Sequence, residues 1–504
     1  MSLTQSRQVD PDFLALPLTA VSDAAIQTGL SLGASHVDIR VERVRTGILQ
    51  LRDTTPETQI DGSVSGIGVR VIVNGAWGFA SAPEISADKA RELAKVAVAM
   101  AKTSGPLSTE EIALAPEPVY AGKTWVSEYE IDPFDVPGAE KIARLAELNG
   151  SLLKSTAVNF ASAASMFVKE QKHYADSYGT STTQQRVRIQ THIEAFNVGE
   201  NGFESIRTLA QPAGFGWEWM GNTAWNWDAE ISELPTLLAE KVAAPSIVAG
   251  KYDLLIHPSN LWLTIHESIG HATELDRALG YEANYAGTSF ATVDNLNKLQ
   301  YGSSLMNITG DRVTPHGLST VGYDDEGVEA QRWDIIKDGL LVGYQLDRRI
   351  ASRAGRERSN GCAFADSPSH VPIQRMPNVS LQPNPTGPDF AGLVAGVEDG
   401  ILIKGDNSWS IDMQRYNFQF TGQQFHRIKN GEIVGQVKDV AYQATTTDFW
   451  RSMKTVGGPS TYVLGGAFNC GKAQPGQIAA VSHGCPAAVF DKVNVLNTVA
   501  EAGK

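Results

Sequence analysis

The sequence predicts an α+β protein: an N-terminal mixed α/β domain, then a mainly antiparallel β domain carrying the helix of a candidate metal site. The first half mixes alternating strand patterns with amphipathic helices, whereas the second half is rich in short apolar runs separated by turn dipeptides. The chain has 504 residues. That length suggests roughly two or three domains, and we place the main units at 1–230 and 231–504.

Strand patterns occur early in the chain. Val37, Ile39 and Val41 alternate with polar residues, and residues 69–73 lead to the dipeptide Asn74-Gly75. Asn-Gly between β-rich runs is a strong hairpin signal, so a second strand is expected directly after it. The alternation returns at 186–196 and predicts a further strand there.

Helix patterns lie between these strands. Ser86 can cap a helix over 87–102, whose apolar face would include Leu93, Val96 and Met100. Further helices are expected after Pro137 and before Pro245. The tryptophans between them fit either a core or a subunit interface, and we favour the interface. They are Trp217, Trp219, Trp225 and Trp227.

The second half begins with a predicted strand at 252–256, followed by Pro258 in the first turn of a helix that ends by Gly280. Proline-rich residues 368–388 suggest a loop. Tight turns are expected at three dipeptides, which indicates an antiparallel sheet, curved or barrel-like. They are Asp338-Gly339, Asp399-Gly400 and Asn430-Gly431.

The predicted helix contains His266, Glu267 and His271. Histidine is a common zinc ligand, and a neighbouring glutamate is the usual base for metal-dependent hydrolysis. Five residues separate the two imidazoles, so a regular α-helix would place them roughly 140° apart, too far to share an ion. An i→i+5 turn would bring them to one side. We therefore predict a widened turn between Glu267 and His271, tolerated by Gly270.

A catalytic zinc takes three protein ligands, so a third must come from elsewhere in the chain. We choose Cys470, which lies in a glycine-rich segment beside Lys472, a cation that would favour the thiolate. Cys485 with His483 offers an alternative ligand or a second site, although core packing explains Cys485 more simply, and Cys362 has no evident partner.

Two acidic residues follow the motif. Glu274 and Asp276 either orient a ligand histidine through its second ring nitrogen or form an ordinary charged helix surface. The sequence favours neither reading.

Composition narrows the function classes. The net charge is −14 with dispersed acidic residues, and this offers no broad basic surface for nucleic acid. The 3 cysteines do not form a disulfide framework, which favours a reducing compartment. Neither a signal peptide nor an apolar run of about 20 residues occurs, so we expect a cytoplasmic protein without membrane association.

With these segments in view, the chain resembles the TldD/PmbA family of zinc metallopeptidases, in particular its metal-bearing TldD-like branch. The resemblance runs along nearly the whole chain. It depends on His266-Glu267-x-x-x-His271, Glu274–Glu282, Ala286–Phe290, Gly322–Val328, Cys470–Lys472, Gly66–Arg70 and Gly75–Phe79.

The resemblance implies a peptidase that cleaves small or unfolded peptides. Zinc would be held by the residues matching His266, His271 and Cys470, with Glu267 as general base. It also implies a homodimer or a heterodimer with a related chain.

Two alternatives stay open. One is a noncatalytic zinc-containing subunit that binds peptides within a larger assembly; such a site has no need of Glu267 as a base. The other is a cysteine peptidase using Cys470, whose activity would be insensitive to chelators.

Overall fold

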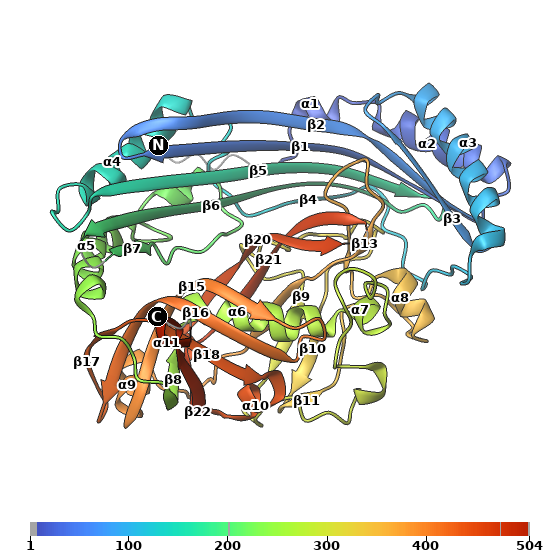
Figure 1. The fold of residues 1–504 in the computed structure, drawn as a ribbon. Coiled ribbons are helices and arrows are strands. Elements are labelled where there is room, and N and C mark those ends of the chain that lie inside the picture. Colours follow the sequence, from blue (N-terminus) through green and yellow to red (C-terminus); the bar gives the residue numbers. More distant parts are fainter. Residues whose placement is uncertain (1–7, 200–201, 474, 502–504) are drawn as a thin grey trace.

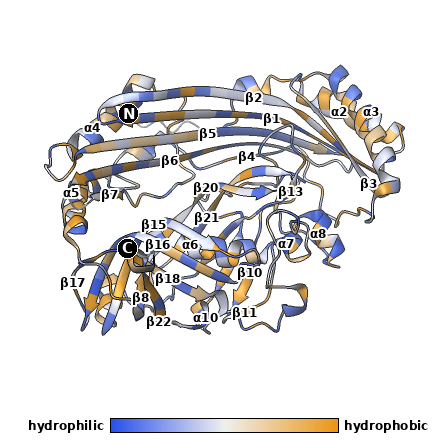
Figure 2. Ribbon diagram, viewed as in Figure 1, coloured by the Kyte–Doolittle hydropathy of each residue, from blue (hydrophilic) through white to orange (hydrophobic). Residues whose placement is uncertain are grey.

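The computed structural model describes residues 8–199, 202–473 and 475–501. A long N-terminal sheet arches over the C-terminal half, and the hairpin β20–β21 lies between them (Figure 1). In Figure 2, hydrophobic and hydrophilic residues are interspersed along the long strands, and β1 and β5 are buried on both faces over part of their length.

The N-terminal sheet has the order β3-β2-β1-β5-β6-β4, with β7 also paired to β6. Only the β4–β6 pairing is parallel. Asn74 and Gly75 have φ of 51° and 73°, which confirms the predicted hairpin turn between β2 and β3. The strands are β1 (His36–Arg52), β2 (Thr55–Val73), β3 (Ala76–Ala82), β4 (Lys123–Val126), β5 (Phe160–Asp176), β6 (Ser181–Gly199) and β7 (Gly202–Arg207).

Helices cover both ends of this sheet: α2 and α3 pack at one end, α4 and α5 at the other (Figure 1). They are α1 (Pro11–Leu14), α2 (Leu18–Ser31), α3 (Ala87–Ser104), α4 (Gly138–Leu152) and α5 (Trp227–Ala243).

The buried face of α3 differs from the prediction. Ser86 caps the helix as expected, accepting a hydrogen bond from the backbone N–H of Lys89. Val96 and Met100, however, are 43% and 51% exposed. Small alanines face the sheet instead, because the helix lies so close to β3 that a Cβ on Gly78 would be 1.8 Å from the Ala97 carbonyl oxygen.

The tryptophans fill a core, so the predicted subunit interface is wrong for three of them. Trp217, Trp219 and Trp227 are buried between α4, α5 and the N-terminal sheet, and Trp225 packs against the same cluster. Trp227 donates its indole N–H to the Trp219 carbonyl at 2.7 Å, which satisfies its polar atom inside the core.

The C-terminal half is built on a closed sheet with the order β15-β8-β22-β18-β16, because β15 also pairs with β16. This confirms the barrel-like prediction. Strands β17 and β19 attach to β16 and β22. The strands are β8 (Gly250–Ile256), β15 (Asp399–Ile411), β16 (Asn417–Lys429), β17 (Glu432–Val437), β18 (Val440–Thr445), β19 (Met453–Val456) and β22 (Ala488–Asn497).

Two of the three predicted turns are confirmed. Residues 338–339 and 430–431 have positive φ at both positions. The turn predicted at Asp399-Gly400 is wrong, because both residues pair within β15. Gly400 is required by close packing, since a Cβ there would lie 2.5 Å from the Asp253 carbonyl oxygen of β8.

Smaller elements complete the fold. The predicted loop 368–388 contains β13 and β14, so the loop prediction is partly wrong.

Within the described residues, no helix is long and apolar enough to span a membrane. The remaining elements are α6 (Pro258–Ile265), α7 (Leu275–Ala278), α8 (Arg348–Arg353), α9 (Phe390–Ala395), α10 (Thr446–Arg451), α11 (Thr498–Glu501), β9 (Ile308–Asp311), β10 (Arg332–Lys337), β11 (Leu340–Leu341), β12 (Ala363–Phe364), β13 (Ile373–Gln374), β14 (Asn378–Leu381), β20 (Val463–Ala473) and β21 (Gly476–Cys485).

Candidate metal centre

The helix α6 is entirely buried and contacts β15, β20 and β21. Pro258 occupies its first turn, as predicted, and the preceding His257 side chain accepts a hydrogen bond from the Ser259 N–H. The helix then widens into a π-helical turn over residues 266–270. This confirms the widened turn that the spacing of the histidines requires.

Neighbouring side chains donate hydrogen bonds to backbone carbonyls of the widened turn. Tyr301 donates its hydroxyl to the Ser268 carbonyl, and Gln345 donates Nε2 to the Gly270 carbonyl at 2.6 Å. Gly270 is needed for space, because a Cβ there would lie 2.6 Å from the sulfur of Met376. Its φ of −51° is ordinary, so the glycine serves packing and is not needed for an unusual backbone conformation.

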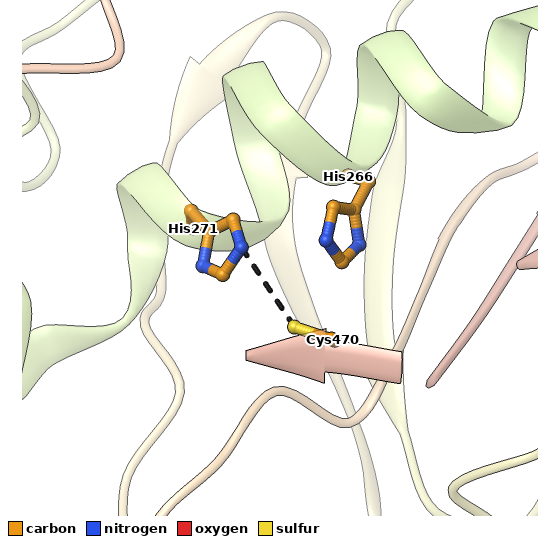
Figure 3. A group of neighbouring side chains, drawn as sticks. All are labelled: His266, His271 and Cys470. Atoms are coloured by element: carbon orange, nitrogen blue, oxygen red, sulfur yellow. Dashed lines mark hydrogen bonds between the residues drawn. The ribbon is translucent and has the colours of Figure 1, made fainter. Parts of the chain in front are cut away.

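The turn places the two predicted histidines beside Cys470 of β20 (Figure 3). One donor atom from each of His266, His271 and Cys470 lies within 4.8 Å of the others, and all three side chains are buried. The Cys470 sulfur is 3.7 Å from His271 Nε2. Cys470 follows a register shift in the β20–β21 pairing. In the described part of the chain, no second group of three such donors occurs.

Hydrogen bonds on the far side of each ring define the histidine tautomers. His271 Nδ1 lies 2.8 Å from Glu274 Oε2, a carboxylate that accepts a hydrogen bond from Nδ1–H, so Nε2 keeps its lone pair. His483 Nδ1 must donate to the Val379 carbonyl at 2.9 Å. Neutral His483 Nε2 therefore accepts from His266 Nδ1 at 2.7 Å. Both ligand candidates thus keep Nε2 free for an ion.

Electrostatics keep these rings neutral. Burial, with the nearby His271, lowers the pKa of His266 well below its usual value. Burial, with Arg415 nearby, does the same for the pKa of His271. Burial also holds the pKa of His483 at about 4. Neutral imidazole is the form that binds metals.

The role predicted for Lys472 is wrong. Its ammonium bonds to carboxylates, at 3.2 Å from Glu274 Oε1, 2.7 Å from Asp276 Oδ2 and 3.3 Å from Glu282 Oε1. It therefore holds Glu274 against His271. The pKa of the Cys470 thiol is raised to about 11 by burial, with Arg375 opposing the shift. A bound cation would be needed to hold the thiolate at neutral pH.

Glu267 forms an ion pair with an arginine from the turn between β15 and β16. Arg415 Nη1 donates to Glu267 Oε2, and both side chains are largely buried. Burial raises the pKa of Glu267, while the charge of Arg415 opposes the rise. Arg415 also lines a cavity of about 670 Å³ together with Arg277, Gly471 and Gln477. The lining thus includes the residue after Cys470 and the partner of Glu267, but none of the three candidate ligands.

Sequence reasoning missed Arg415 and the role of His483. Arg415 lies 148 residues after Glu267 in the sequence, so no local motif joins the two residues. Its left-handed φ of 65° is not indicated by the residue type either. The sequence offers His483 only as a metal ligand with Cys485, whereas in the structure it bonds to His266. Cys485 packs in the hydrophobic core, as the favoured interpretation predicts, with its sulfur 3.8 Å from the Pro258 carbonyl oxygen.

The sequence profile of the PmbA/TldA metallopeptidase C-terminal domain matches residues 249–497, and that of domain 1 matches residues 37–101. Together they cover more than half of the chain. The chain belongs to the PmbA/TldD metallopeptidase family.

Individual relatives agree with the family assignment. A protein named metalloprotease from Methanothermobacter thermautotrophicus is 26% identical over 95% of this chain and 97% of its own. A protein named zinc metalloprotease TldD homolog from Saccharolobus solfataricus is 22% identical over 93% of this chain and 98% of its own. TldE from Thermococcus kodakarensis shares the fold, with a TM-score of 0.72, 15% identity and coverage of 94% and 99%.

Proposed function

We propose that this PmbA/TldD family member hydrolyses peptide bonds with zinc held by His266, His271 and Cys470. The donor set supports the proposal, because imidazole nitrogen and thiolate are both usual zinc ligands and a catalytic zinc takes three protein ligands. The observation that supports the proposal most is that these three donors lie close together beside Glu267. Zinc would polarise the scissile carbonyl and make water more acidic.

Glu267 performs the proton transfers in this proposal. Its carboxylate accepts a proton as the water oxygen bonds to the carbonyl carbon, and the same proton passes to the amine nitrogen as the C–N bond breaks. Arg415 holds the Glu267 carboxylate by its Oε2 atom, and Trp409 also donates a hydrogen bond to this carboxylate. The buried surroundings disfavour the charged carboxylate and so make it a stronger proton acceptor.

The substrate class is an extended, unfolded peptide. In the described residues β20 pairs only with β21, so its other edge has no strand partner, although the Cys470 carbonyl there already accepts from Arg375 Nη2. A peptide can add to such an edge through backbone hydrogen bonds, with little demand on its side chains. The dimer remains a proposal from the family resemblance.

Digestion of a single protein in folded and reduced, unfolded forms tests this function. The zinc-loaded chain should cleave the unfolded form at least about tenfold faster, because only an extended segment can pair with β20. Chelator should abolish cleavage and added zinc should restore it. Equal rates on both forms contradict the substrate class. Chelator-insensitive cleavage favours a cysteine peptidase, and metal binding without any cleavage favours a noncatalytic peptide-binding subunit.

A further inference from the structure

Arg415 lies in the turn between β15 and β16, and its backbone is held in an unusual conformation. Its φ of 65° falls in the left-handed region that favours glycine. The Asp412 side chain fixes this turn by accepting from the backbone N–H groups of Tyr416 at 2.8 Å and Asn417 at 3.0 Å. Thr446 donates its hydroxyl to the Arg415 carbonyl at 2.7 Å. A non-glycine residue keeps such a conformation only where its surroundings impose it, and residues of this kind cluster at active sites.

The guanidinium of Arg415 links the proposed base to the cavity of about 670 Å³. Nη1 donates to Glu267 Oε2, and Nε is fully buried. Nη2 has no acceptor in the described part of the chain, and it is not among the fully buried atoms. The side chain is 16% exposed and lines the cavity beside Gly471. Nη2 is therefore an accessible donor without a partner.

Other charged groups in the cavity lining are engaged elsewhere. Arg277 Nη1 donates to two backbone carbonyl groups at 2.7 and 3.1 Å. Lys472 pairs with three carboxylates. Asp366 accepts hydrogen bonds from a histidine ring at 2.6 Å and from a backbone N–H at 2.7 Å. Of the two arginines in the lining, only Arg415 bonds to Glu267 within the described residues.

The proposed reaction moves a negative charge away from Glu267. When the water oxygen bonds to the scissile carbon, the water proton passes to Glu267 and the π electron pair of the carbonyl moves to the carbonyl oxygen. Glu267 becomes neutral, and the charge appears on the substrate oxygen. Arg415 would then be a buried cation without a counter-charge, which is costly unless it bonds to that oxygen. The attacking water contacts both Glu267 and the scissile carbon, so the oxygen develops its charge beside the guanidinium.

We propose that Arg415 is a further catalytic residue, which stabilises the substrate oxyanion through Nη2 while Nη1 stays bonded to Glu267. A planar guanidinium presents several donors in a fixed fork, so it serves both acceptors at once. Donors that are already oriented toward a charge present only in the transition state accelerate the reaction. This inference rests on the proposed peptidase function and adds a second role for Arg415, beyond holding the base.

Calorimetric binding of two uncleavable peptides to the zinc-loaded full chain tests this role. One is a phosphinic peptide, whose tetrahedral anionic group replaces the scissile bond, and the other is its ethylene isostere, which has no oxygen there. Arg415→Gln should weaken binding of the phosphinic peptide at least about tenfold and change binding of the isostere by less than about twofold, with zinc content unchanged. Arg415→Lys should show the same selective loss, because lysine keeps a cation beside Glu267 but has no second nitrogen.

Arg427→Gln is the matched control, because Arg427 is 15% exposed and pairs with Asp399 at the opposite end of the β15–β16 pair. It should leave both affinities unchanged. A role limited to holding Glu267 would be rescued by lysine, so wild-type affinity of Arg415→Lys for the phosphinic peptide overturns the inference and leaves the peptidase proposal intact. If Arg415→Gln does not fold, Arg415→Lys decides alone. A wild-type chain that neither cleaves peptides nor binds the phosphinic peptide overturns the proposed function and this inference with it.

Discussion

Glu267→Gln is expected to lower kcat for peptide hydrolysis by about a thousandfold, within the range for loss of a general base. The amide oxygen of glutamine can still accept the hydrogen bond from Arg415, so the local structure should persist. The amide cannot accept the proton of the attacking water. Because Glu267 is outside the His266, His271 and Cys470 group, the zinc content should stay at the wild-type value.

Peptide cleavage rates and zinc content, measured together on the purified variant, check this expectation. Glu230→Gln is a suitable control, since Glu230 is another poorly solvated carboxylate, bonded to the Leu209 N–H and the Trp225 indole. Wild-type turnover in Glu267→Gln would remove Glu267 from the mechanism. Loss of zinc from this variant would instead show that the residue supports the metal centre.

Cys470→Ser should weaken zinc binding by at least about 100-fold, more than is typical when a residue behind a ligand is lost. A serine hydroxyl stays protonated and is a poor zinc ligand, whereas thiolate is a strong one. The remaining two imidazoles cannot form a three-ligand site. Activity at limiting zinc should fall in parallel, and a zinc competition assay measures the affinity directly.

Cys485→Ser provides the matched control for this variant. Cys485 is equally buried, but it packs in the barrel core and lies outside the donor group. It should alter stability and leave zinc affinity unchanged. If Cys485→Ser lost zinc while Cys470→Ser retained it, the assignment of the third ligand would be wrong.

The sequence predicted those features of the centre that depend on local spacing. Five residues between His266 and His271 exclude a regular helix for a shared ion, and this geometric conflict alone predicts the π-helical turn. The glycine-rich surroundings of Cys470 indicated close backbone approach, although Lys472 serves carboxylates and not the thiol. Local pattern therefore located three candidate ligands that the structure brings together, but it misassigned a nearby charge.

Features set by the fold could not be predicted in this way. Arg415 reaches Glu267 only because β15 and β16 close the barrel and return the chain to α6. His483 stands behind His266 because β21 packs beside β14, whose Val379 carbonyl accepts from His483 Nδ1. The wrong turn prediction at Asp399-Gly400 has the same origin. The glycine is required because β8 packs closely against it, and it does not form a turn.

Zinc K-edge X-ray absorption on the stoichiometrically loaded wild-type chain tests the central claim most directly. The account predicts one sulfur at about 2.3 Å and two imidazole nitrogens at about 2.0 to 2.1 Å, with a light atom completing the shell. The sulfur contribution should be absent in Cys470→Ser. A wild-type zinc shell of nitrogen and oxygen alone, or failure of the chain to take up one equivalent of zinc, would contradict it.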